Sequence, residues 1–131
     1  MASSITLSGL TNAFTLSGAP NTTATTATPV TMKVTTNNTL GYAVTVQASS
    51  ATMTPAGLGN TDTIASSALE VRETGTTSYS PLSALTPVTV HSQSARSAST
   101  GDTINNDYRM VIPFVNSDTY SVTLTYIATT K

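Results

Sequence analysis

Four tyrosines are the residues of this chain best suited to holding a ligand. A flat aromatic ring stacks on the face of a sugar while its hydroxyl forms hydrogen bonds, so Tyr42, Tyr79, Tyr108 and Tyr126 are candidate glycan contacts. Tyr42 and Tyr126 each fall in phase with neighbouring apolar residues at period 2, which predicts that both pack in a core. Tyr79 and Tyr108 lie nearer to turn sequences and are expected to be the more reachable pair.

A second candidate site is the acidic and amide-rich stretch from Gly101 to Asp107. Its side chains include Asp102, Asn105 and Asp107, and Ca²⁺ takes roughly six to eight oxygen ligands, often from such stretches. The spacing does not match an EF-hand, and clusters of Asn and Asp also make turns. The two interpretations are a Ca²⁺ site and a turn, and no other cofactor is indicated.

The single histidine, His91, raises the question of catalysis. A serine nucleophile needs a base within hydrogen-bond reach and a carboxylate that orients the base. Ser92 is adjacent to His91, but neighbouring residues of a strand point to opposite faces, and no Gly-x-Ser-x-Gly elbow is present. The sequence therefore predicts a surface histidine at a strand end and a protein that is not an enzyme.

The elements that must position these residues are β-strands. Residues 30–35 and 42–48 alternate apolar and polar residues around an Asn- and Gly-containing turn, which predicts a β-hairpin over residues 30–48. Further strands are predicted over 3–8, 13–17, 87–92, 108–115 and 120–129, with an interruption at Pro113 and one helical turn near 64–69.

These strands and the turns between them predict one all-β domain over residues 1–131. Seven to nine short strands without a convincing helix favour an antiparallel β-sandwich of immunoglobulin-like or jelly-roll size, and a small barrel is the alternative. Residues 1–18 are predicted to form an N-terminal extension or a strand donated to another copy.

The composition of the chain excludes several classes of binding partner. Charged residues make up 8%, the net charge is −1 and there is no cysteine, so neither a basic surface for nucleic acid nor a thiolate metal site is expected. No apolar run is long enough to span a bilayer, so no membrane insertion is expected. About a third of the residues are Thr or Ser, far above ordinary usage. The abundance of Thr favours strands, and the Thr/Ser-rich, charge-poor composition favours an exported, extracellular protein.

Two strand segments resemble a known family. The WxL domain of Gram-positive surface proteins carries a proximal Trp-x-Leu and a distal Tyr-x-x-x-Leu-Thr-Trp-x-Leu. Here Tyr42-Ala43-Val44 stands where the first motif falls, and the segment 120–128, Tyr-Ser-Val-Thr-Leu-Thr-Tyr-Ile-Ala, matches the second in Tyr, Leu and Thr. Tyr replaces both Trp residues, so the chain resembles a distant, Trp-less relative. The resemblance implies an exported β-rich domain held non-covalently at a bacterial cell wall.

The expected function is therefore structural or adhesive. Polar strand faces made of Thr, on a chain with little charge, offer smooth surfaces that identical subunits can share without repulsion. We expect non-covalent assembly with further copies, as a homo-oligomer or fibre, or with cell-wall polymer. The alternative is a carbohydrate-binding module for cell-wall polymers that uses the tyrosines and polar groups of the loops.

Overall fold

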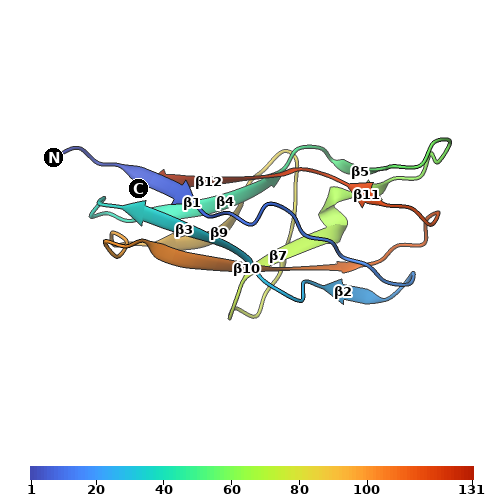
Figure 1. The fold of residues 1–131 in the computed structure, drawn as a ribbon, viewed down its shortest axis with the longest axis horizontal. Coiled ribbons are helices and arrows are strands. Elements are labelled where there is room, and N and C mark those ends of the chain that lie inside the picture. Colours follow the sequence, from blue (N-terminus) through green and yellow to red (C-terminus); the bar gives the residue numbers. More distant parts are fainter.

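Alternating apolar and polar residues organise the chain into two facing layers of antiparallel strands, as Figure 1 shows for the computed structural model of residues 1–131. The first layer has six strands. In spatial order they are β1 (Ile5–Ser8), β3 (Val30–Thr36), β10 (Asp102–Val111), β7 (Leu69–Glu73) and β8 (Ser80–Pro81), and β2 (Thr23–Thr25) pairs with the carboxyl end of β10.

The second layer consists of two three-stranded sheets set end to end. One has the order β12 (Leu124–Thr130), β4 (Tyr42–Ala48) and β9 (Val88–Gln93); the other has the order β11 (Tyr120–Ser121), β5 (Thr52–Pro55) and β6 (Ile64–Ala65). The Ser49 N–H donates to the Thr123 carbonyl, which links the two sheets. The only helical element is a 3-10 turn at Ser66–Ala68, where one helical turn was expected. No helix is long and apolar enough to cross a membrane.

The prediction of an all-β antiparallel sandwich is confirmed. The structure has twelve strands rather than seven to nine. Four of the twelve, β2, β6, β8 and β11, are only two or three residues long, and so short a segment has no period that could reveal it in the sequence.

The core lies between the layers. It is one cluster of sixteen buried apolar residues, and its largest contributions come from the even-numbered positions of β3, β4 and β10. Burying a Val, Leu or Met side chain stabilises a fold by about 1.5–3 kcal/mol, so this inward register fixes which face of each strand meets water.

The predicted hairpin over residues 30–48 is wrong, although both strands are present. β3 pairs with β1 and β10, whereas β4 pairs with β9 and β12, so the connecting turn crosses from one layer to the other. Gly41 has a φ of +95°, and a Cβ there would lie 1.9 Å from the Gln93 carbonyl oxygen. The crossing therefore requires glycine, and two strands with inward apolar faces pack across a sandwich as well as they pair within one sheet.

Residues 1–18 pack against their own domain. β1 pairs with β3 over four residues, and Phe14, beyond it, stacks on the buried Tyr108 ring with centroids 4.6 Å apart. Ile5, Leu7 and Leu16 also contact the core. In Figure 1 this segment runs along most of the molecule before it enters β2. Residues 13–17, expected as a strand, form none, but Phe14 and Leu16 still pack against the core.

Candidate functional site

Tyr108 and Tyr126 form a buried hydroxyl network. Tyr108 is fully buried because it follows Ile104 and Asn106 on the inward face of β10, and its hydroxyl lies 2.5 Å from that of Tyr126. The Tyr126 hydroxyl donates to Asn106 Oδ1 at 3.0 Å. Burial raises the pKa of Tyr108 above its ordinary value and that of Tyr126 to about 12.

The prediction that Tyr108 is reachable is therefore wrong, whereas the predicted core packing of Tyr126 is confirmed. The sequence prediction placed the strand at residues 108–115, but β10 begins at Asp102 and ends before Pro113. With the full strand in view, Tyr108 is in phase with Ile104 and Met110, and that is the signal for its burial. Asn106, which shares this phase, is a buried polar residue that the sequence prediction missed.

Tyr42 anchors a second polar network at the opposite end of β10. It is fully buried, as predicted, and its hydroxyl donates to Asp102 Oδ2 at 2.7 Å. Burial opposes ionisation of the Asp102 carboxyl, but hydrogen bonds from the Ala98 N–H, the Tyr42 hydroxyl and the Gln93 amide outweigh it and hold the pKa of Asp102 below its ordinary value. Burial and the Asp102 carboxylate both raise the pKa of Tyr42.

His91 bridges the two layers rather than standing free at the surface. Its Nδ1 lies 2.6 Å from Glu73 Oε2 and its Nε2 lies 2.8 Å from Gln93 Oε1. The Gln93 Nε2 donates to backbone carbonyls, which orients its oxygen toward the imidazole. Both ring nitrogens therefore lie within hydrogen-bond distance of a side-chain oxygen. Neither nitrogen is left to accept a proton from a serine.

Tyr79 is half-buried on the outer face of the first layer. The guanidinium carbons of Arg72 and Arg109 lie 4.6 and 4.1 Å from its ring centroid. Each arginine also pairs with a carboxylate, Arg72 with Asp107 at 3.2 Å and Arg109 with Glu70 at 3.0 Å. The ring that was expected to stack on a sugar is thus already engaged in cation–π contacts.

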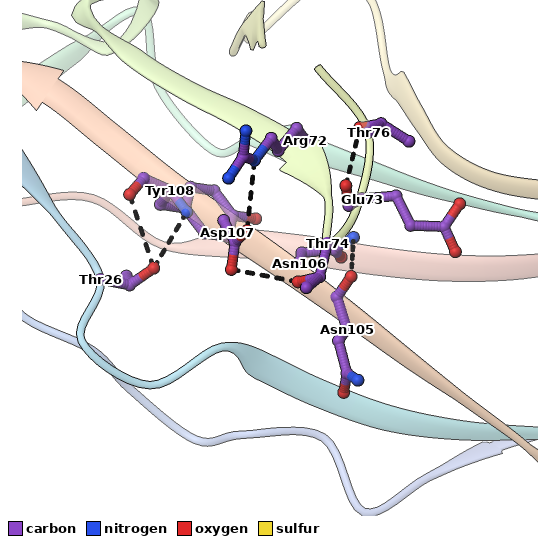
Figure 2. Close-up of polar contacts among 9 residues, drawn as sticks. All are labelled: Thr26, Arg72, Glu73, Thr74, Thr76, Asn105, Asn106, Asp107 and Tyr108. Carbon is purple, nitrogen blue, oxygen red and sulfur yellow. Dashed lines mark hydrogen bonds and ion pairs between the residues drawn. The ribbon is translucent and has the colours of Figure 1, made fainter. Parts of the chain in front are cut away.

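The three candidate Ca²⁺ ligands are not brought together. They lie on β10 rather than in a loop, and successive residues of a strand alternate faces, so Asp102 is on the inward face whereas Asn105 and Asp107 are on the outward face. Figure 2 shows Asp107 beside Arg72 and the backbone contact between Thr74 and Asn105. Pairing of β10 with both neighbours overrides the low strand propensity of Asn and Asp.

The two layers differ sharply in charge. Seven of the eleven charged residues lie on strands of the first layer: Lys33, Glu70, Arg72, Glu73, Asp102, Asp107 and Arg109. No strand of the second layer carries a Lys, Arg, Asp or Glu. The outward residues of β12 and β4 are Thr125, Ile127, Thr129, Ala43, Thr45 and Gln47, and the half-exposed Ile127 is the largest apolar side chain among them.

The second layer also has a hollow at its surface. Its volume is about 280 Å³ and it lies where β5 and β11 meet the start of β12. Six of its seven lining residues carry hydroxyl groups, namely Ser49, Ser50, Thr52, Thr54, Ser121 and Thr123. No aromatic ring lines it. The hollow can offer hydrogen bonds but no stacking platform.

The segments that resemble the WxL motifs are neighbours in the second layer. β4 contains Tyr42-Ala43-Val44, and its ladder with β12 places Val44 opposite Ala128 and Tyr42 opposite Thr130. No protein-family model matches the chain, and comparisons with curated proteins and with solved structures find no significant match.

Proposed function

We propose that the chain is an exported structural or adhesive protein of a bacterial surface that assembles non-covalently with further copies or with the cell wall. The observation that carries the proposal is the absence of Lys, Arg, Asp and Glu from every strand of the second layer. A solvent-facing layer without charge lacks the repulsion that normally keeps identical proteins apart.

The positions of the candidate residues support a binding role without chemistry. The hydroxyls of Tyr42 and Tyr126 are engaged with Asp102 and Asn106, and the His91 imidazole with Glu73 and Gln93. On β12 and β4 of the second layer, the outward side chains are hydroxyl-bearing, apolar or amide groups, and none is charged. Such surfaces act through shape and backbone hydrogen bonds, as strand-addition partners do. The resemblance of β4 and β12 to the WxL motifs supports placement at a Gram-positive cell wall.

Measuring the solution mass across a concentration series, with negative-stain imaging of the concentrated sample, tests self-assembly. Pull-down on insoluble cell-wall polymer tests wall binding. We expect a defined oligomer or filaments, retention on the polymer, or both. A chain that stays monomeric when concentrated and is not retained on the polymer would overturn the proposal.

A carbohydrate-binding module is the second candidate, and the hydroxyl-lined hollow favours it. Thr52 and Thr54 on β5 and Thr123 before β12 offer hydrogen-bonding groups to a sugar. If the hollow binds glycan, Thr52→Val and Thr54→Val reduce retention on wall polymer and leave the solution mass, and so the oligomeric state, unchanged. Tyr79→Ala serves as the control on the opposite layer, since its ring is held by two arginines.

A further inference from the structure

We infer that the outer edge of β12 pairs with the same edge of a second copy, antiparallel and centred on Ile127, so that the β12-β4-β9 sheets of two copies become one six-stranded sheet. The inference rests on the proposed function and names the interface that would serve it. The occupant of the edge is thus a second molecule of this chain.

The backbone of β12 has unpaired hydrogen-bonding groups along this edge. In an antiparallel ladder, every second residue exchanges hydrogen bonds with the partner strand, and the residues between point their N–H and C=O groups the other way. The Thr123 carbonyl accepts from the Ser49 N–H and the Lys131 N–H donates to the Gly41 carbonyl, and Ser49 and Gly41 flank β4. The odd residues therefore face β4, and the even residues Leu124, Tyr126, Ala128 and Thr130 direct their backbone groups outward, where no backbone partner exists.

Three other edge strands, β8, β9 and β1, carry features that discourage pairing, and β12 carries none. β8 has two residues and ends in Pro81. β9 follows Pro87 and has a bulge, because His91 and Thr89 pair with adjacent β4 residues and leave Val90 without a partner. β1 has only four residues. β12 is regular over seven residues and has no proline, charge or bulge. These are the features that protect an edge strand from pairing, so the edge of β12 is open to another strand.

The register of such a pair satisfies every outward group. With Ile127 opposite Ile127 of the second copy, Tyr126 of each copy lies opposite Ala128 of the other, and Leu124 of each copy lies opposite Thr130 of the other. These are the hydrogen-bonded positions, so four pairs exchange two bonds each. Thr125 then lies opposite Thr129 on the uncharged outer face. The two isoleucines form the close, non-hydrogen-bonded pair in the centre, where cross-strand side chains contact best.

Charge also favours a like partner. The strands that would adjoin, β12 and β4, contain no charged residue in either copy. The nearest charge in the chain is Lys131, directly after β12, and antiparallel pairing sends the two Lys131 residues to opposite ends of the interface. β1 also lies near β12, but it bonds to β3 and shares no hydrogen bond with β12.

The experiment uses sedimentation velocity on the full-length chain and on three variants. Ile127→Lys and Ile127→Glu each place like charges opposite one another, so each alone is expected to raise the dimer Kd about tenfold or more. An equimolar mixture of the two is expected to dimerise again, because the introduced ammonium of one copy would then face the introduced carboxylate of the other. The control is Thr45→Lys, which adds the same charge on the same face next to Ile127, but on the central strand β4.

The outcomes separate this interface from the broader proposal. Loss of the dimer in both Ile127 variants, its return in the mixture and its persistence in Thr45→Lys support edge pairing. If the wild type assembles and the Ile127 variants assemble equally well, or if Thr45→Lys weakens assembly as much as they do, the proposed edge is overturned and self-assembly still stands. A monomeric wild type that binds wall polymer overturns the edge alone, whereas one that does neither overturns the proposed function too.

Discussion

Replacing Tyr126 with Phe tests the buried hydroxyl network that joins the two layers. The Tyr126 hydroxyl donates to Asn106 Oδ1 and contacts the Tyr108 hydroxyl, and both Asn106 and Tyr108 are fully buried. Tyr126→Phe removes one oxygen and leaves a buried amide oxygen without a donor. An unsatisfied buried acceptor costs about 1–3 kcal/mol. For a domain of this length, about 2 kcal/mol lowers Tm by roughly 6–10 °C.

Tyr108→Phe is the informative comparison. In that variant the Tyr126 hydroxyl still donates to Asn106, so only the bond between the two hydroxyls is lost, worth about 0.5–1.5 kcal/mol. The double variant is expected to cost less than the sum of the single variants, because the two hydroxyls are partners. Tyr79→Phe is the control, since the Tyr79 ring is held by arginines through its face.

Urea unfolding of the four variants, followed by circular dichroism, gives the free energies of unfolding. The reasoning requires that Tyr126→Phe destabilises more than Tyr108→Phe. If the order is reversed, or if the double variant is strictly additive, Tyr126 is not the donor that satisfies Asn106 and the network is assigned wrongly.

Three further predictions follow from backbone geometry and charge. Ala128→Pro removes an outward N–H and should leave unfolding within about 1 kcal/mol of wild type while weakening self-association in sedimentation, whereas Thr129→Pro removes a ladder bond to β4 and should cost about 3 kcal/mol in urea unfolding. Gly41→Ala should unfold the domain or cost well over about 2 kcal/mol in the same assay, because its Cβ would meet the Gln93 carbonyl and its φ is positive. The lowered pKa of Asp102 contributes stability that is present above the ordinary pKa of about 3.9 and is lost as pH falls through the lower folded value. Thermal melts of Asp102→Asn should therefore lack that part of the acid-induced loss, and a melt series that parallels wild type below about pH 4 would contradict it.

The strands could be predicted from the sequence because their signal is local. The period-2 alternation of residues 42–48 depends only on which side chains face the core, and β4 has those bounds in the structure. The same argument placed Tyr42 and Tyr126 inward. It failed for Tyr108, because the polar residues 102–107 hide the beginning of β10, and pairing with β3 and β7 decides that those residues are strand.

The partners of each strand, by contrast, are decided between segments far apart in the chain. The turn at residues 37–41 suits a hairpin, yet it crosses between layers because β4 finds β9 and β12. The open edge of β12 also depends on pairing between distant segments. No local pattern in the sequence shows that β12 lies at the edge of its sheet or which of its backbone groups point outward. Alternation acts residue by residue, and it is enough to make this chain a set of strands with one apolar face each. The uncharged layer and the open edge of β12 arise only in the folded chain, because both depend on which distant strands become neighbours.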